Sequence, residues 1–346
     1  MPGDTLGTPD RLFLNQQDGP FKDISKDSGL LADGKELGVF AGDFNRDGWI
    51  DFYVANDVIR NSLYIGQGNN QFREQAILAG AAGNESGAAE GSMGLDSGGY
   101  DGDGLADLFV TNYELEENAL YHNNGDGLFS HSTFAAGLAG KSRPHVGWAT
   151  GFADFDSDSW LDLFIVNGHV VYHNRQSPFR QPAIVYRNTG GRRFEDATEK
   201  AGPWFSFPHN ARGATVGDLD NDGAPDLVVS LLDEPVVLLR NRQPPRNWVS
   251  LHLRGTAHDI DAVGASAEVK LGERTLTRFV RGGGGYASYF DPRLLLALPA
   301  DDAATIKARV RWPDGQEEVF SNLHTRQVHQ IVEGAGVLAV PVVGKD

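Results

Sequence analysis

The sequence predicts an all-β protein in which a β-propeller is followed by a smaller, sandwich-like β domain. Two sequence blocks alternate and repeat along the first 241 residues. The segments after them alternate between apolar and polar residues, as half-buried strands do. Glycine is abundant, with 43 of 346 residues, which suits tight turns between short strands. We therefore expect two domains, residues 1–241 and residues 242–346.

The first block joins an acidic loop to a short apolar strand. It occurs four times, and its loops begin at Asp43, Gly99, Asp154 and Asp218, at intervals of 56, 55 and 64 residues. We name these loops 1 to 4, residues 43–51, 99–107, 154–162 and 218–226. Aromatic or β-branched residues follow the last Asp of each loop, and such residues favour strands.

The second block has the pattern of a β-hairpin. Its copies begin at Arg11, Ser62, Ala119 and Ile184, and each runs from an apolar stretch through a turn rich in Asn, Gly or Gln to a Phe. A fifth, broken copy ends at Asn241. Together the two blocks supply about four strands per repeat, which predicts propeller blades. A β-sandwich or a solenoid built from hairpins is the alternative architecture.

The chain changes character after Asn241. A proline-rich joint, QPPR at residues 243–246, suits a domain boundary. Beyond it, segments such as WVSLHL, SAEVKL and IKARVRW alternate in hydropathy up to about residue 334. This pattern predicts a second all-β domain.

Composition excludes several classes of function. Asp and Glu number 47 against 30 Lys and Arg, giving a net charge of −17, which opposes binding to nucleic acid or to an anionic membrane. No apolar run approaches the ~20 residues that span a bilayer, so no membrane insertion is expected. The absence of cysteine excludes disulfides, thiolate metal sites and cysteine nucleophiles. No signal peptide is visible at the start of the sequence.

The acidic loops have the spacing of a cation site. The pattern D-x-[DN]-x-D-G-x-x-D places side-chain oxygens at positions 1, 3, 5 and 9, and the backbone carbonyl at position 7 can add another ligand. Glycine at position 6 allows the positive φ that turns the chain back. Oxygen-only ligands in a wrapped loop favour Ca²⁺ over Mg²⁺, which demands stricter geometry. A site filled by protein ligands is a structural staple and a poor Lewis-acid catalyst.

The loops differ in quality, and about four calcium sites are expected. Loop 4 is complete, and loop 1 is complete with one neutral amide ligand. Loop 3 keeps four acids but has Ser159 in place of glycine, whereas loop 2 begins with Gly99 and is the weakest. The predicted ligands are Asp43, Asn45, Asp47 and Asp51, then Asp101, Asp103 and Asp107, then Asp154, Asp156, Asp158 and Asp162, and finally Asp218, Asp220, Asp222 and Asp226.

These motifs resemble a known family. GDFNRDGWIDFYV and GDLDNDGAPDLVV are similar to FG-GAP/VCBS calcium-loop repeats. GWATGFADFDSDSWLDLFIVNGHV and the later NWVSLHLRG, RGGGGYAS and VRWPDGQEE are similar to the CRTAC1-like family, which joins a propeller to an ASPIC/UnbV domain. The resemblance implies an integrin α-like propeller, structural calcium at the positions above, secretion or a periplasmic location, and adhesion through a protein or glycan partner.

The chain departs from that family pattern in ways that leave ring closure open. It has four calcium loops and begins with an outer hairpin. The chain is then a fragment of a longer protein, a propeller of reduced blade number, or one that closes with its C-terminal domain or with another chain. The last alternative would make it an oligomer.

Four histidines are candidates for an alternative function, an enzyme of lyase, hydrolase or cyclase type. His169 and His173 follow loop 3 in NGHVVYHN, while His145 and His209 each precede a strand that leads into an acidic loop. Each could act as a general base or ligate a transition metal, although polar loop residues are the ordinary interpretation. Propeller topology would gather a pocket near the axis from Arg143, His145, Trp148, His209 and Arg212.

Overall fold

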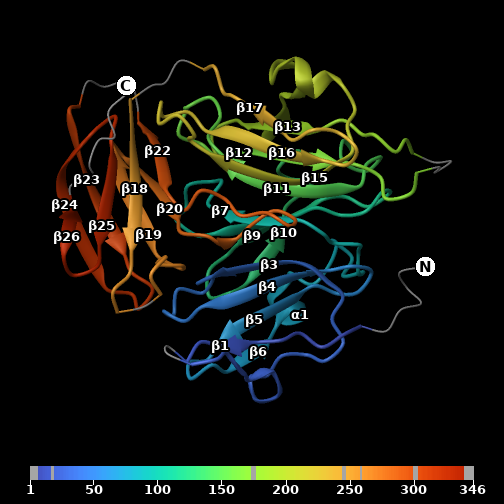
Figure 1. Cartoon of the computed structure of the whole chain (residues 1–346), viewed down its shortest axis with the longest axis horizontal. Helices are drawn as coiled ribbons and strands as arrows, with labels where there is room; N and C mark the ends of the chain where they lie inside the picture. Colours follow the sequence, from blue (N-terminus) through green and yellow to red (C-terminus); the bar gives the residue numbers. More distant parts are fainter. Residues whose placement is uncertain are drawn as a thin grey trace.

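The structure is a computed structural model that describes residues 7–16, 19–172, 177–243, 247–257, 259–298 and 303–338. These residues form an arc of four antiparallel sheets with a β-sandwich beside it (Figure 1). We call the sheets of the arc blades 1 to 4, in chain order. The fold is therefore the predicted all-β propeller type with a small C-terminal β-sandwich. No helix among the described residues has the length and apolar character needed to cross a membrane.

Each blade follows the two repeated sequence blocks. Blade 1 contains β3 (Glu36–Gly42), β4 (Asp51–Asn56), β5 (Ser62–Gly66) and β6 (Phe72–Glu74). Blade 2 contains β7 (Leu95–Gly98), β8 (Asp107–Val110), β9 (Ala119–Asn123) and β10 (Phe129–His131). Blade 3 contains β11 (Gly147–Ala153), β12 (Asp162–Asn167), β13 (Ile184–Asn188) and β14 (Phe194–Asp196), and blade 4 contains β15 (Ala211–Gly217), β16 (Asp226–Leu231) and β17 (Val237–Leu239).

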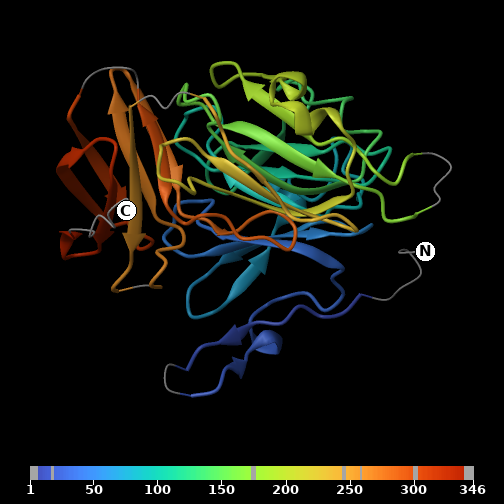
Figure 2. The same ribbon diagram turned by 45° about the horizontal axis from the view of Figure 1, so that its top comes forward.

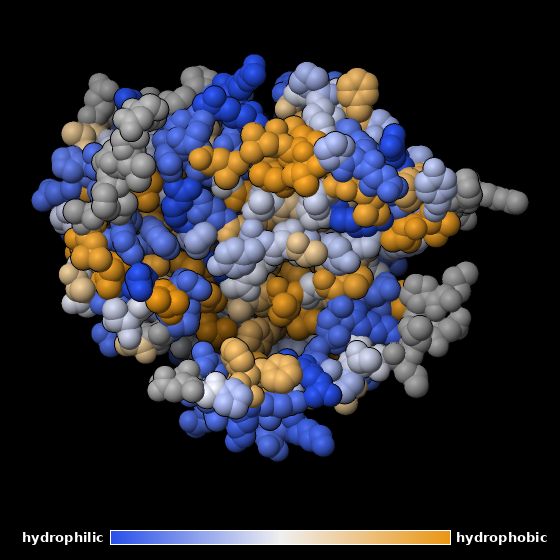
Figure 3. Space-filling view, in the orientation of Figure 1, coloured by the Kyte–Doolittle hydropathy of each residue, from blue (hydrophilic) through white to orange (hydrophobic). Residues whose placement is uncertain are grey.

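Blade 4 has three strands within the described residues, where about four per repeat were expected. The sequence explains the difference, because the fifth copy of the second block breaks off at Asn241 and runs into two prolines, which have no N–H to donate. Strand β17 is therefore an edge among the described residues; Leu238 in it is 60% exposed, and Val236 directly before it is 66% exposed. Figure 3 shows an apolar patch over the region of β16 and β17.

Short elements flank the blades. A hairpin of β1 (Phe13–Leu14) and β2 (Lys22–Asp23) precedes blade 1, and the short helix α1 (Ala76–Ala79) follows it. Among the described residues, short 3-10 helices span Ser25–Asp27, Thr198–Lys200 and Pro203–Ser206.

Apolar and aromatic side chains fill the spaces between blades. The rings of Tyr53 in blade 1 and Tyr121 in blade 2 lie 6.3 Å apart, and each hydroxyl donates to a backbone carbonyl. Phe109 in blade 2 meets Phe152 in blade 3 edge to face at 6.3 Å. Burial of such rings stabilises each blade against its neighbour. Among the described residues, the buried apolar side chains form a separate cluster at each contact between neighbouring blades.

The C-terminal residues form two packed four-stranded sheets (Figure 2). One contains β22 (Leu294–Leu298), β18 (Asn247–Arg254), β25 (Val328–Val332) and β26 (Gly336–Leu338), and the other contains β20 (Arg274–Phe279), β19 (Ser266–Leu271), β23 (Thr305–Arg311) and β24 (Glu317–His324). Val249, Leu251, Val310 and Trp312 are buried in the core between them. The boundary predicted between residues 241 and 242 falls between β17 and β18 and stays a prediction.

A segment of the sandwich runs along the first strands of the blades. We call residues 281–291, between β20 and β22, the axial segment. Gly282 and Gly283 form β21 (Gly282–Gly283) and pair with Ala41 and Phe40 of β3. A Cβ on Gly282 would lie 2.6 Å from the Cβ of Ala41, so the glycine run allows this close approach.

The axial segment continues past the other three blades. The Gly285 N–H donates to the Leu95 carbonyl of β7 at 2.7 Å. Tyr286 packs on the Trp148 ring of β11 at 4.5 Å, and the Ala214 N–H of β15 donates to the Ser288 hydroxyl at 3.0 Å. The segment therefore contacts the first strand of every blade of the arc.

Candidate metal centres

Each acidic loop is the turn between the first and second strands of its blade. Strand pairing sets Gly42 opposite Asp51, Gly98 opposite Asp107, Ala153 opposite Asp162 and Gly217 opposite Asp226. All four loops therefore lie at the same end of their blades. The structure brings the predicted ligands of each loop into one turn.

The carboxylate at position 1 closes the loop on itself. Asp218 accepts the N–H of Asp222 at 3.0 Å with Oδ1 and that of Gly223 at 2.9 Å with Oδ2. Asp43 in loop 1 and Asp154 in loop 3 accept hydrogen bonds from the corresponding pairs of backbone N–H groups. Since each carboxylate oxygen has two lone pairs, these bonds orient the group and leave room for a cation.

The carboxylate at position 9 ties the loop to the third strand. Asp162 accepts the Phe155 N–H at 3.0 Å within loop 3 and the Asn188 N–H at 2.8 Å from the end of β13. Asp51, Asp107 and Asp226 accept the equivalent pairs of N–H groups. Sequence reasoning assigned these residues as ligands only, whereas the structure also makes them anchors between strands.

Loop 3 keeps the turn of its neighbours without the expected glycine. At position 6, φ is +87° for Gly48, +91° for Gly223 and +74° for Ser159. Ser159 adopts this left-handed conformation, and its hydroxyl donates to the Ala297 carbonyl of β22 at 2.9 Å. The substitution of serine for glycine thus preserves the loop and adds a contact with the sandwich.

Burial makes ionisation of several loop carboxylates unfavourable. Desolvation, with a smaller effect of neighbouring aspartates, raises the pKa of Asp51 and of Asp154 to about 7 and that of Asp162 to about 8. A bound divalent cation reverses this effect by stabilising the charged form. Without a bound cation, these carboxyl groups are therefore only partly ionised at neutral pH.

A residue near the end of the third strand faces each loop, and sequence reasoning missed it. This residue is Ile65 in blade 1, His122 in blade 2, Arg187 in blade 3 and Arg240 in blade 4. Arg187 contacts Asp156 and lies 3.0 Å from Asp158 Oδ2, and Arg240 contacts Asp220 and Asp222. The available signal was the basic residue followed by Asn that recurs in YHN, YRN and LRN.

The Asn of that pair connects each loop to the next blade. The side-chain amides of Asn123, Asn188 and Asn241 donate to the carbonyls of Phe44, Tyr100 and Phe155, at 3.0, 2.8 and 2.9 Å. Each acceptor is position 2 of the loop in the preceding blade. The loops are therefore joined in series along the arc.

The side-chain donors predicted in loops 1, 3 and 4 are all oxygen, the ligand type that calcium takes. Among the described residues, three carboxylates converge in loops 3 and 4 and not in loop 1. In loop 3, ligand atoms of Asp154, Asp156 and Asp162 lie within 4.8 Å of one another, as do those of Asp218, Asp220 and Asp222 in loop 4. In loop 2 the corresponding group is Asp101, Asp107 and His122. Loop 2 does not fit the same ion, since one of its three donors is an imidazole nitrogen and position 1 has no side chain.

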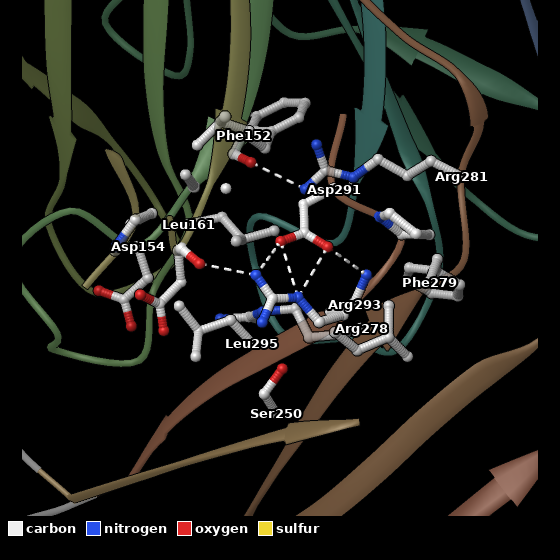
Figure 4. Close-up of a pocket in the computed structure, with 18 of the residues that line it drawn as sticks. Phe152, Asp154, Leu161, Ser250, Arg278, Phe279, Arg281, Asp291, Arg293 and Leu295 are labelled. Carbon is white, nitrogen blue, oxygen red and sulfur yellow. Dashed lines mark hydrogen bonds and ion pairs between the residues drawn. The ribbon is translucent and has the colours of Figure 1, made fainter. Parts of the chain in front are cut away.

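The loop end of the arc faces the sandwich. Arg311 donates to the Arg46 carbonyl of loop 1 at 2.9 Å, and Arg293 donates to the Asp218 carbonyl of loop 4 at 2.6 Å. A cavity of about 70 Å³ lies between the two parts, and Figure 4 shows Asp291 held there by Arg293. On its wall Arg281 pairs with the buried Asp96 at 3.0 Å. Loop conformation and sandwich docking are therefore physically linked.

Two of the candidate histidines, His169 and His209, have separate carboxylate partners. His169 is buried, and its Nε2 lies 3.2 Å from Glu114 Oε1. His209 lies 2.9 Å from Glu234 and stacks on Trp204 at 4.5 Å. Burial lowers the pKa of His145, and His173 lies outside the described residues. A catalytic role for these histidines stays a prediction.

The predicted axial pocket is only partly assembled. The Arg212 guanidinium lies 4.3 Å from the centre of the Trp148 ring, so these two residues do come together. Tyr286 of the axial segment packs on the same ring, however. The space where the sequence predicted a pocket is therefore lined by a segment from the second domain.

Comparison with known proteins now identifies the family. The FG-GAP-like repeat profile matches residues 5–54, 99–165 and 154–229, together more than half of the chain, and the ASPIC and UnbV profile matches residues 255–338. The chain belongs to the FG-GAP-like repeat family and carries an ASPIC and UnbV domain. The ASPIC and UnbV match covers the greater part of the sandwich.

Cartilage acidic protein 1 is a relative of this FG-GAP protein. The mouse protein is 24% identical over 321 residues, covering 90% of this chain and 47% of its own length. The human protein is 26% identical over 299 residues, covering 70% of this chain and 44% of its own length. The chain thus spans about half the length of the curated relatives it matches.

A solved structure also shows a likeness. It is an Agrocybe aegerita lectin described for its recognition of non-reducing terminal N-acetylglucosamine, 19% identical, with a TM-score of 0.38 over 67% of this chain and 60% of that chain. At that TM-score the likeness decides nothing about ligand or function.

Proposed function

We propose that this FG-GAP protein is a calcium-stabilised binding module that acts outside the cell, or in the periplasm, by adhering to a protein or glycan partner. The observation that carries the proposal is the repetition of one oxygen-lined turn in loops 1, 3 and 4. The family assignment and relatives named for cartilage support an adhesive, extracellular role. No nucleic-acid partner is proposed, because the net charge is −17.

Calcium has a structural role in this proposal. It would be held by Asp43, Asn45, Asp47 and Asp51 in loop 1 and by the four acids of loops 3 and 4. Because the same turns contact Arg293, Arg311 and Ala297 of the sandwich, calcium would hold the acidic turns and the sandwich in one arrangement. Free energy of binding to the folded state adds to stability.

The proposal is tested by immobilising the purified chain and probing it with a glycan array and with a panel of purified matrix proteins. We expect binding to one of these classes in Ca²⁺ and loss of that binding in EGTA. The variant Asp222→Ala should weaken binding at limiting Ca²⁺, whereas Asp27→Ala, an exposed aspartate outside the loops, should not. Absence of binding to both panels in Ca²⁺ would contradict an adhesive role.

A further inference from the structure

Loop 2 differs from its neighbours in the atom that faces its carboxylates. The Nδ1 of His122 lies 3.2 Å from Asp101 Oδ2 and 3.1 Å from Asp107 Oδ1. One ring N–H cannot point directly at two oxygens, so hydrogen bonding accounts for one of these contacts. A protonated imidazole would pair with both carboxylates, and a cation among the three atoms would account for both contacts when the imidazole is neutral.

The strand register makes His122 distinctive. The N–H of the next residue, Asn123, donates to Asp107, just as that of Asn188 donates to Asp162 in blade 3. At the position of His122, blades 3 and 4 carry arginines, which have no lone pair to offer a metal, and blade 1 carries an isoleucine. Blade 2 alone of the four described blades places a metal-ligating side chain there.

The backbone of loop 2 also excludes the usual first ligand. A Cβ on Gly99 would lie 2.8 Å from the carbonyl oxygen of Leu105, at position 7 of the loop. An aspartate at position 99 would therefore force the loop to shift. Loop 2 is built around glycine at this position, and its donor set lacks the carboxylate that begins a calcium loop.

We propose that loop 2 binds a divalent transition ion of the Zn²⁺ class through Asp101, Asp107 and His122, in place of calcium. Two carboxylates and an imidazole are donors typical of zinc, whereas calcium takes oxygen ligands almost exclusively. Metal–ligand bonds of ~2.0–2.1 Å in a tetrahedron separate neighbouring ligand atoms by about 3.3 Å. The observed separations of 3.1 and 3.2 Å are close to that value.

The surroundings orient these ligands. Asp107 is buried and accepts the N–H groups of Tyr100 and Asn123 at 3.2 and 2.9 Å. The Tyr100 ring meets the His122 ring edge to face at 6.3 Å. The side chains of His122 and Asp101 are 26% and 18% exposed, so an ion can reach the site from solvent. Such outer contacts fix ligand direction.

The test uses untagged full-length chain, stripped of metal by a chelator and then saturated with Ca²⁺. ZnCl₂ is titrated by calorimetry, and Co²⁺ is used as a second probe because its visible spectrum reports ligand number and type. We expect one Zn²⁺ site that excess Ca²⁺ does not displace. His122→Arg, the residue found in blades 3 and 4, should weaken Zn²⁺ binding more than about 100-fold, since even loss of an outer contact costs 10–100-fold.

Two further variants complete the design. His324→Arg, on β24 and exposed, should bind Zn²⁺ like the unchanged chain. Asp101→Asn should weaken Zn²⁺ binding while leaving Ca²⁺-dependent melting unchanged, and it carries the test if His122→Arg does not fold. The proposal would be overturned if the chain took up no Zn²⁺, if Ca²⁺ displaced all of the Zn²⁺, or if a change at His122 or Asp101 left the Zn²⁺ affinity unchanged. None of these results would bear on calcium in loops 1, 3 and 4.

Discussion

At the scale of single residues, one carboxylate often has two roles in this FG-GAP protein. Asp162 accepts two backbone N–H groups from different elements and is also placed to ligate a cation. The spacing of the sequence predicted the second role. The role of Asp162 as a backbone acceptor depends on Asn188 at the end of β13, which lies 26 residues along the chain. The equivalent pairs in the other blades are 15 or 16 residues apart, so no local sequence pattern revealed this hydrogen bond.

Complete and incomplete loops should respond differently to loss of one acid. Asp222→Ala removes an oxygen ligand and the acceptor of the Ala224 N–H, so we expect a loss of about 2–3 kcal/mol in saturating Ca²⁺, the value of one site at ~100 times its Kd. Asp101→Ala in loop 2 should lower the free energy of unfolding by less. Urea unfolding in Ca²⁺ measures both, and equal losses would contradict the ranking of the loops.

The buried aspartates also predict a pH dependence for the metal-free protein. Burial raises the pKa of Asp51 and Asp154 to about 7 and that of Asp162 to about 8, above the ordinary value of about 3.9. The folded state then binds protons more tightly than the unfolded state, and stability falls as pH rises from about 4 to about 8. Melting in EGTA across this range checks the slope; rising stability would refute it.

At the scale of elements, sequence patterns predicted the strands because each block carries its own periodicity and turn residues. Ser159 was read as a departure from the loop pattern, and the structure shows the same turn with an added bond to Ala297. That contact joins residues 138 positions apart, which local spacing cannot reveal. The three-stranded blade 4 follows from the broken fifth hairpin copy.

The recurrent asparagine should matter for contact between blades. Asn188 is fully buried and donates to carbonyls of both loop 2 and loop 3, at 2.8 and 3.0 Å. Asn188→Ala leaves both acceptors unpaired, so we expect a loss of about 2–4 kcal/mol in urea unfolding. Asn124→Ala, at an exposed asparagine directly after β9 in the preceding blade, is the matched control and should change stability by under about 0.5 kcal/mol. If Asn188→Ala left the free energy of unfolding unchanged, the contact between blades would not depend on these two hydrogen bonds.

At the scale of the whole molecule, the axial segment was the least predictable feature. Its sequence, RGGGGYAS, indicates no pairing partner, because pairing with β3 and contact with three other first strands depend on how two domains meet. The alternatives left open for ring closure included use of the C-terminal domain. The structure shows that domain's segment along all four blades of the arc.

Arg281 provides a test of this docking. It pairs with Asp96, whose pKa burial raises to about 6 while Arg281 opposes the rise. Arg281→Met should cost about 3–5 kcal/mol at neutral pH, because it leaves a buried charge without its partner. Arg281→Met with Asp96→Asn should recover part of that loss. Arg309→Met, which breaks an exposed pair with Glu317, should cost at most about 1 kcal/mol.

Thermal unfolding of one preparation in EGTA and then in excess Ca²⁺ shows whether calcium holds the acidic turns together. Three sites, each contributing about 2–3 kcal/mol at ~100 times its Kd, should raise the melting temperature by more than about 10 °C. Superimposable unfolding curves in the two buffers would contradict the claim.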